Sequence, residues 1–150
     1  ADGPATHTPR MCGFQAAGAA PLVLGHDGET PETVATAIRI GKPASGSKAL
    51  AARDDSNGLI SSVTDEQILD AQAFLAAKEG IFVEPASAAG VAGLLALKQS
   101  GDLPAGQRIV ITVTGNGLKD IDTALSRTEL STEAVEPSTD RVAALLGLHQ

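Results

Sequence analysis

Short apolar segments of strand length alternate along this chain with segments that begin and end like helices. The apolar segments are residues 10–15, 59–63, 81–83 and 108–114, and the last is almost continuously hydrophobic. An unbroken apolar run is typical of a strand that is buried on both faces, as in a parallel sheet covered by helices. The alternation predicts an α/β fold containing part of a doubly wound parallel sheet flanked by helices.

Hydroxyl, proline and glycine residues mark the ends of the expected helices. Thr64 and Gln67 have the spacing of a capping box, so a helix is expected over residues 65–79. Pro85 begins an Ala- and Leu-rich helix that ends near residue 100. Thr30-Pro31-Glu32 indicates a helix that continues to about residue 41. Shorter helices are expected over residues 44–52, 121–127 and 140–148.

The pattern divides the chain into three parts. Residues 1–9 contain two prolines and a glycine and are expected to form an irregular lead-in. Residues 10–128 carry the α/β pattern. Residues 129–150 combine a polar linker with a last amphipathic helix.

Charge and hydropathy exclude several classes of partner. The chain has 11 Lys+Arg against 18 Asp+Glu, a net charge of −7. An acidic balance disfavours nucleic acid and anionic membrane surfaces, because phosphate binding depends on clustered cations. No apolar run reaches the roughly 20 residues that span a bilayer. The single cysteine requires no oxidising compartment, so a cytoplasmic location is expected.

Side chains that commonly bind metals or attack substrates are scattered. His7, His26 and His149 have no carboxylate or cysteine at ligand spacing, so no metal site is expected. Cys12 lies in an apolar run and is interpreted as a core residue rather than a nucleophile. Each lysine lies in a polar stretch or helix flank and is interpreted as solvated. The lysines are Lys42, Lys48, Lys78, Lys98 and Lys119.

Loops that follow the expected strands are the places where ligands bind in parallel sheets. The candidates are residues 41–45, 84–87 and 114–117. Gly115 and Gly117 let backbone amides approach a ligand, although the same pattern suits a tight turn. The spacing fits neither a Walker A loop nor a dinucleotide-binding loop. For Glu84 and Ser87, capping of the following helix is the favoured interpretation when the turn is taken alone.

Taken together, these motifs resemble bacterial threonine synthase, a pyridoxal-phosphate-dependent enzyme of fold type II. The matching segments are residues 10–21, 31–45, 64–68, 79–89 and 112–120. The Glu-Pro-Ala-Ser turn occurs across the wider fold-type II class, whereas the Thr-Gly-Asn-Gly-Leu-Lys-Asp loop is specific to threonine synthase. The resemblance covers only the C-terminal part of the family's longer sequence. Residues 10–128 are therefore expected to form the C-terminal half of the larger cofactor-binding domain.

The resemblance implies a reaction and a set of cofactor contacts. The reaction converts O-phospho-L-homoserine and water into L-threonine and phosphate with pyridoxal phosphate, in a protein that is often a homodimer. Thr114 matches the residue that hydrogen-bonds the pyridine nitrogen, and Ala37 matches the residue that packs on a ring face. Gly115 and Glu84 complete the expected cofactor-binding set. No residue of this chain is assigned a catalytic role.

Departures from the family pattern affect activity. The Schiff-base lysine of the Ser-Phe-Lys-Asp motif and the Gly-Asn-Ala-Gly-Asn phosphate loop do not occur in this sequence. The chain by itself is therefore expected to be inactive. Lys42, Gly46 and Ile121 stand where the family usually has Asn, Trp and Pro, which puts local substrate contacts in doubt.

Two alternatives remain open. Another fold-type II enzyme such as threonine dehydratase would share the fold, but its loop usually reads Ser-Gly-Gly-Asn in place of residues 114–117. A non-catalytic α/β module that binds a partner or a small anion would also fit the composition.

Overall fold

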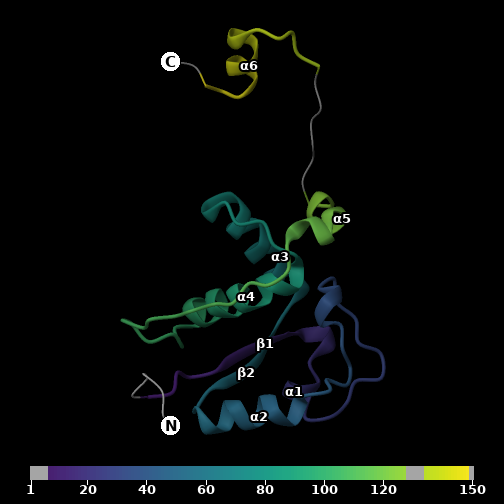
Figure 1. The fold of residues 1–150 in the computed structure, drawn as a ribbon, viewed down its shortest axis with the longest axis vertical. Helices are drawn as coiled ribbons and strands as arrows, with labels where there is room; N and C mark the ends of the chain where they lie inside the picture. Colours follow the sequence, from purple (N-terminus) through teal and green to yellow (C-terminus); the bar gives the residue numbers. More distant parts are fainter. Residues whose placement is uncertain (1–6, 128–133, 149–150) are drawn as a thin grey trace.

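The structure, a computed structural model that describes residues 7–127 and 134–148, has helices on both faces of a parallel strand pair (Figure 1). The strands are β1 (Cys12–Ala16) and β2 (Leu59–Val63). The α-helices are α1 (Pro21–Leu24), α2 (Gly46–Asp55), α3 (Asp65–Phe74), α4 (Pro85–Ser100), α5 (Ile121–Leu125) and α6 (Thr139–Leu145). The 3-10 turns are η1 (Ala17–Ala19), η2 (Thr36–Ile38) and η4 (Gly117–Lys119), and η3 (Leu75–Glu79) is a π-helical turn.

The sheet confirms the predicted α/β class. β1 and β2 run parallel, with Cys12 opposite Leu59 and Ala16 opposite Val63. Helix α4 packs against both strands, and α1 and α2 contact β2. In Figure 1, α4 and α2 lie on opposite sides of the strands. This is the helix–sheet–helix arrangement that a parallel sheet requires.

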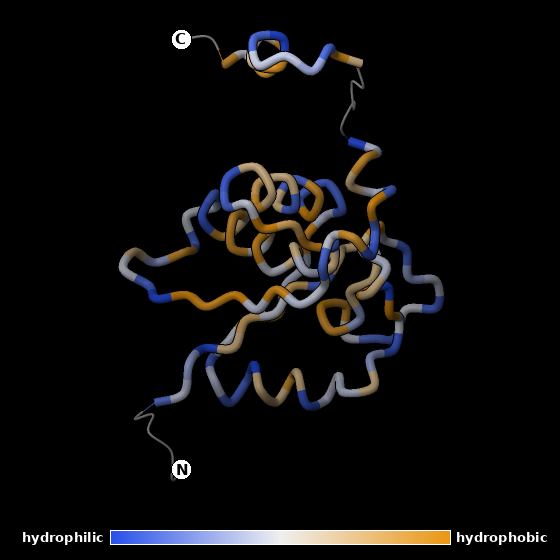
Figure 2. Tube along the Cα trace, turned by 45° about the horizontal axis from the view of Figure 1, so that its top comes forward, coloured by the Kyte–Doolittle hydropathy of each residue, from blue (hydrophilic) through white to orange (hydrophobic). Residues whose placement is uncertain are grey.

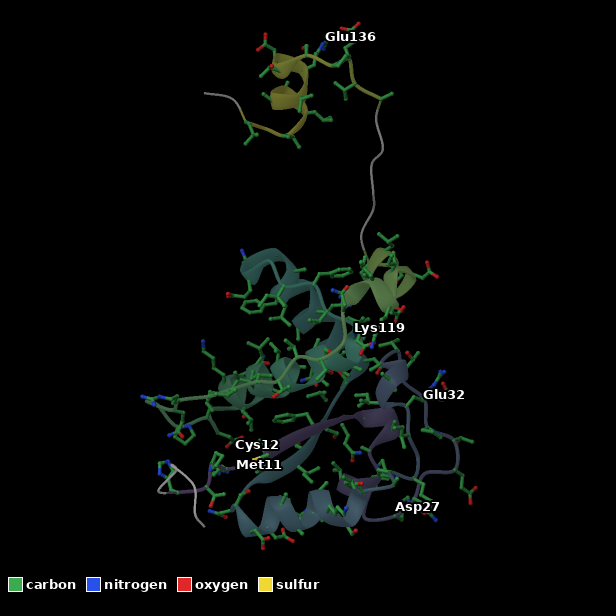
Figure 3. All side chains as sticks on the ribbon, in the orientation of Figure 1. Met11, Cys12, Asp27, Glu32, Lys119 and Glu136 are labelled. Atoms are coloured by element: carbon green, nitrogen blue, oxygen red, sulfur yellow. The ribbon has the colours of Figure 1, made fainter. Side chains whose placement is uncertain are left out.

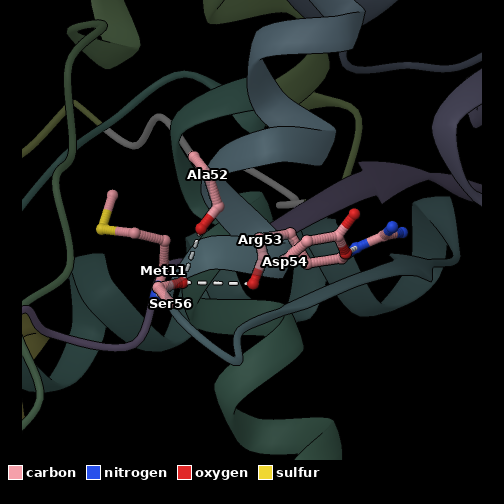
Figure 4. Close-up of polar contacts among 5 residues, drawn as sticks. All are labelled: Met11, Ala52, Arg53, Asp54 and Ser56. Carbon is pink, nitrogen blue, oxygen red and sulfur yellow. Dashed lines mark hydrogen bonds and ion pairs between the residues drawn. The ribbon is translucent and has the colours of Figure 1, made fainter.

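Ser56 joins the end of α2 to the start of the sheet (Figure 4). The backbone N–H of Met11 donates to Ser56 Oγ at 3.0 Å, and that hydroxyl donates to the carbonyl oxygen of Ala52 at 2.6 Å. Leu59 N–H then donates to the Met11 carbonyl at 3.1 Å. A Cβ at Gly58 would lie 1.9 Å from that same carbonyl oxygen, so only glycine permits the approach.

Helix α3 forms as its local sequence predicts. Thr64 Oγ1 accepts the Gln67 N–H at 3.2 Å, and Gln67 Oε1 accepts the Thr64 N–H at 2.8 Å, which completes the expected capping box. The apolar face formed by Ile68, Ala71 and Leu75 is buried, with exposed fractions of 0%, 0% and 7%. This face packs against α4 and contributes to the core.

Small residues allow the close packing expected for an aromatic-poor chain. The ring of Phe14 lies against Gly93 of α4, where a Cβ would approach ring atoms to 2.2 Å. Gly18 accepts a hydrogen bond from the Glu32 N–H at 2.9 Å through its carbonyl oxygen. A Cβ on Gly18 would lie 2.0 Å from the Glu32 oxygen, so this close approach of two backbone segments requires glycine.

The helix predicted from Thr30 to about residue 41 is wrong, because only η2 forms there. The backbone before η2 bonds to Asp65 and to a neighbouring side chain instead of forming a helical turn. The Val34 N–H donates to Asp65 Oδ2 at 3.0 Å, and the buried Thr33 hydroxyl donates to Asp65 Oδ1. The Ala35 N–H donates to Thr33 Oγ1 at 3.1 Å. The two bonds to Asp65 are tertiary contacts, and they override the local sequence signal for a helix.

The strands predicted over residues 108–114 and 81–83 are also wrong in this structure. Within the described residues, the first segment has no strand partner and the second makes only a single antiparallel bridge, Val83 to Asn116. Val110 is 88% exposed and Ile109 is 45% exposed, whereas Ile111 packs against the core. Figure 2 shows the hydrophobic colour of this extended segment. An apolar run becomes a buried strand only when neighbouring strands flank it.

Cys12 is exposed, so its predicted place in the core is wrong (Figure 3). It is the first residue of β1, and burial along this strand increases only toward Ala16. The face of the sheet at this end of β1 is therefore accessible.

The ends of the chain are only partly described. The irregular lead-in expected over residues 1–9 and the linker expected over residues 129–139 include residues outside the described ranges. The last predicted helix forms as α6 and is shorter than expected. Among the described residues, no helix has the length and apolar character needed to cross a bilayer.

Candidate functional site

Two of the three predicted loops meet in space. The Glu84 N–H donates to the Gly115 carbonyl oxygen at 3.0 Å, and the Gly117 N–H donates to the Phe82 carbonyl oxygen at 3.1 Å. These bonds flank the Val83–Asn116 bridge. The Glu-Pro-Ala-Ser turn and the Thr-Gly-Asn-Gly loop thus form one continuous surface.

Ser87 is the polar centre of this contact. Its Oγ accepts the Gly115 N–H at 2.7 Å and the Thr114 N–H at 3.3 Å, and lies 3.4 Å from Thr114 Oγ1. Ser87 is only 7% exposed, whereas Thr114 is exposed. The first turn of α4 therefore holds the backbone of Thr114 while leaving this residue at the surface.

Glu84 packs against Gly115 and faces Lys119. The Lys119 Nζ lies 3.8 Å from Glu84 Oε1, and the two side chains are 65% and 12% exposed respectively. Figure 3 labels Lys119 beside this part of the fold. A Cβ on Gly115 would lie 1.7 Å from Glu84 Oε1, so the carboxylate occupies the space that a larger residue at 115 would fill.

The interpretation of Glu84 and Ser87 as simple helix caps is wrong. Glu84 is the N-cap residue of α4, but its side chain makes no capping hydrogen bond. The Ser87 hydroxyl accepts amides of the 114–117 loop instead of amides of its own helix. Pro85 at the first helical position has no N–H to satisfy, which lowers the need for a side-chain cap.

Ala37 lies in η2 and is exposed. The turn η2 packs against α4, the helix whose first turn carries Ser87. The path of η2 is fixed by the bonds from Thr33 and Val34 to Asp65. Ala37 thus lies on a turn that packs against α4, and Thr114 is hydrogen-bonded to Ser87 of α4. Both residues are exposed.

The third loop, residues 41–45, makes different contacts. Lys42 Nζ lies 2.9 Å from Asp27 Oδ2, with both side chains largely exposed. This hydrogen bond and the opposite charge of Asp27 raise the pKa of Lys42. Gly46, the first residue of α2, is buried, and a Cβ there would lie 3.1 Å from a methyl group of Leu22.

Sequence reasoning missed two polar residues that support the site, the half-buried Asp65 and the buried Gln72. Asp65 is the first residue of α3, and its carboxylate accepts hydrogen bonds from Thr33 and Val34 in the segment before η2. Gln72 is 5% exposed, and its Nε2 donates to the Val83 carbonyl oxygen at 2.8 Å beside Glu84. The sequence carries one signal for Gln72: its polar side chain directly follows the apolar Ala71 within the predicted helix over residues 65–79.

The surface hollows lie elsewhere. One is on α6 and is lined by residues that include Pro137 and Leu148, and another lies between α3 and α5 and includes Asp70 and Arg127. Neither is lined by the residues of the two loops. Among the described residues, no three or more His, Cys, Asp or Glu side chains gather as metal ligands.

A family model described as pyridoxal-phosphate dependent enzyme matches residues 2–115. This range includes the 84–87 turn and the first residues of the 114–117 loop.

Curated relatives are named threonine synthase. The relative from Synechocystis sp. is 53% identical over 140 residues, covering 93% of this chain and 36% of the relative. The relative from Mycobacterium leprae is 57% identical over 125 residues, covering 83% of this chain and 35% of the relative. The chain thus spans about a third of the length of the curated relatives it matches.

A solved structure shares the fold. It is that of an O-ureido-L-serine synthase variant with O-ureido-L-serine bound, with a TM-score of 0.60 and 21% sequence identity. The similarity covers 94% of this chain and 39% of the solved chain.

Proposed function

Because this chain belongs to the pyridoxal-phosphate-dependent enzyme family, we propose that it supplies one part of a threonine synthase. The whole enzyme would convert O-phospho-L-homoserine and water into L-threonine and phosphate. The observation that carries the proposal is the junction of the Thr-Gly-Asn-Gly loop with the Glu-Pro-Ala-Ser turn through Ser87. In this proposal, residues 10–128 form the C-terminal half of the larger cofactor-binding domain.

The chemistry of the two loops fits a pyridine ring. Thr114 is an exposed hydroxyl residue on a backbone held by Ser87, and it would hydrogen-bond the ring nitrogen. A neutral hydroxyl does not stabilise a protonated nitrogen as a carboxylate does. The nearby carboxylate of Glu84 is engaged with Lys119 and packed on Gly115. Glu84 would therefore shape the loop beneath the cofactor instead of protonating the ring nitrogen.

Ala37 would contact a face of the ring. Its small side chain is exposed on η2, and α4 links η2 to the turn that carries Ser87. When bound, pyridoxal phosphate supplies an electron sink for carbanions formed on the substrate. The residues of this chain would bind and orient the ring, and none of them is given a catalytic role.

The chain by itself is expected to be inactive, because the sequence lacks the Ser-Phe-Lys-Asp motif that carries the Schiff-base lysine. Mixing the chain with pyridoxal phosphate and O-phospho-L-homoserine should release neither threonine nor phosphate. Turnover by the chain alone would contradict this part of the proposal.

A hybrid protein tests the activity directly. The preceding part of the Mycobacterium leprae relative, including its lysine motif, is fused ahead of Arg10, and threonine and phosphate are quantified. We expect threonine from O-phospho-L-homoserine, and a Thr114→Ala hybrid should be weakened. A folded hybrid that produced only 2-oxobutanoate from threonine would favour a dehydratase instead. A folded hybrid with no activity would contradict the proposal.

The proposal also includes a homodimeric, cytoplasmic complete enzyme, as the resemblance implies. Light scattering on the hybrid should give the mass of two chains. A monomeric mass with full activity would contradict the dimer.

A further inference from the structure

We infer that Ser87 is a positioning residue that fixes the Thr114 hydroxyl as a hydrogen-bond donor directed away from α4. The identity of the acceptor rests on the proposed function, whereas the orientation rests on contacts within this chain. No cofactor contact is needed to derive it.

The donors and acceptors around Ser87 determine what its hydroxyl can do. A serine hydroxyl has one hydrogen to donate and two lone pairs that accept. The amides of Gly115 and Thr114 donate to Ser87 Oγ at 2.7 and 3.3 Å, which uses both lone pairs. The remaining hydrogen of Ser87 is then free only to donate.

The Thr114 hydroxyl oxygen is placed to receive this hydrogen. Thr114 Oγ1 lies 3.4 Å from Ser87 Oγ. Ser87 is only 7% exposed, so water competes weakly for its hydrogen. A buried hydroxyl hydrogen without an acceptor is costly, and this favours donation to Thr114. The direction of the bond is therefore from Ser87 to Thr114.

The Thr114 hydroxyl has the same one hydrogen and two lone pairs. One lone pair accepts from Ser87, whose own lone pairs are used by the two amides, so the Thr114 hydrogen is left to donate to another acceptor. An unprotonated ring nitrogen is such an acceptor, whereas a protonated nitrogen would present a second donor. Ser87 would thus keep the Thr114 hydrogen available for an unprotonated ring nitrogen, without touching the cofactor.

The orientation is tested on the isolated chain by NMR. Three-bond couplings report whether the Thr114 side chain occupies one χ1 rotamer. We expect one rotamer in the wild type, averaging in Ser87→Ala, and recovery in Ser87→Thr, which retains the hydroxyl. Ser100→Ala is the matched control, because Ser100 lies on the same helix and its hydroxyl bonds Leu97 and Asp102.

The backbone resonances of each variant show whether it remains folded. A single, unchanged Thr114 rotamer in a folded Ser87→Ala chain would overturn the inference. Rotamer averaging in the wild type would also overturn it. If Ser87→Thr does not fold, the Thr114 rotamer in the wild type and in Ser87→Ala still tests the inference.

The effect on the ring is tested on the hybrid holoenzyme with pyridoxal phosphate carrying ¹⁵N in the ring. In Ser87→Ala the ring nitrogen should take up a proton at higher pH than in the wild type, because the Thr114 hydrogen is then no longer held in place to donate to the nitrogen. Cofactor affinity should fall about three- to tenfold, the effect of one hydrogen bond. A ¹⁵N titration identical to that of the wild type would overturn the inference. A wild-type hybrid that binds no cofactor would contradict the proposed function, whereas the rotamer measurement would still judge Ser87.

Discussion

At the scale of single residues, Gly115 and Glu84 share one small volume. A Cβ added at Gly115 would meet the Oε1, Cδ and Cγ atoms of Glu84 at 1.7, 2.1 and 2.7 Å. Gly115→Ala should therefore displace Glu84 and disturb the amide that donates to Ser87. We expect a loss of about 1–3 kcal/mol in the free energy of unfolding, measured in urea.

A double-mutant cycle isolates the clash. Glu84→Ala removes all three atoms that the new methyl group would meet, so Gly115→Ala should cost much less in that background. Gly13→Ala is the control, because its Cβ would lie at an ordinary 3.7 Å from Ile60. Equal costs of Gly115→Ala in both backgrounds would show that Glu84 is not the obstacle.

Residue roles were predictable where both partners lie close together in the sequence. Thr64 and Gln67 are three positions apart, and their capping box formed as expected. Ser87 and Gly115 are 28 positions apart, so the pattern around Ser87 indicated only a local cap. The partner of a hydroxyl across such a distance is decided by the fold. The resemblance predicted that Thr114, Gly115, Glu84 and Ala37 would bind the cofactor, and this stays a prediction.

At the scale of elements, Asp65 determines the path of the segment before η2. Its carboxylate accepts the Val34 N–H and the buried Thr33 hydroxyl. Asp65→Ala would leave both donors without their acceptor, at an expected cost of about 2–3 kcal/mol in unfolding free energy. Glu66→Ala is the matched control, because Glu66 is an exposed acid in the same first turn of α3. If both variants lost the same unfolding free energy in urea, the effect would come from the helix dipole and not from the bonds of Asp65 to Thr33 and Val34.

Ser56 provides a second element-scale prediction. Ser56→Ala removes the acceptor of the Met11 N–H at the start of β1 (Figure 4). Since this contact is only partly shielded from water, the expected loss is about 1 kcal/mol. Amide hydrogen exchange should show faster exchange at Met11 than in the wild type. An unchanged exchange rate at Met11 would contradict a role for Ser56 in joining α2 to β1.

Elements with their own start and stop signals formed where the sequence predicted them. Helix α3 begins at a capping box, α4 begins at Pro85 and ends at Gly101, and β2 spans the predicted residues 59–63. The failures are the segments whose state depends on distant partners. Within residues 31–40, Thr33 and Val34 bond to Asp65 and no α-helix forms, and residues 108–114 have no neighbouring strand within the described residues.

At the scale of the whole molecule, burial of the 108–114 segment should distinguish the chain alone from the hybrid. Val110 is 88% exposed here, so Val110→Lys should change the unfolding free energy by no more than about 0.5 kcal/mol. Ile68→Ala, at a fully buried position, should cost about 2–5 kcal/mol. In the hybrid, the segment is expected to become a buried strand. There, unlike in the chain alone, Val110→Lys should be strongly destabilising. A neutral effect of Val110→Lys in the hybrid would contradict burial of this segment.

The parallel pairing of β1 with β2 has a consequence for the speed of folding. Parallel strands cannot be joined by a tight turn, and here residues 17–58 must close into a loop before the strands can pair. Helices α3 and α4 are joined by a much shorter segment and pack directly together. Because loop closure costs entropy before it yields contacts, we expect the α3–α4 pair to organise first and the sheet to limit the folding rate. Mutations in the α3–α4 interface should then slow refolding, whereas mutations that weaken the strand pair without touching α4 should mainly accelerate unfolding.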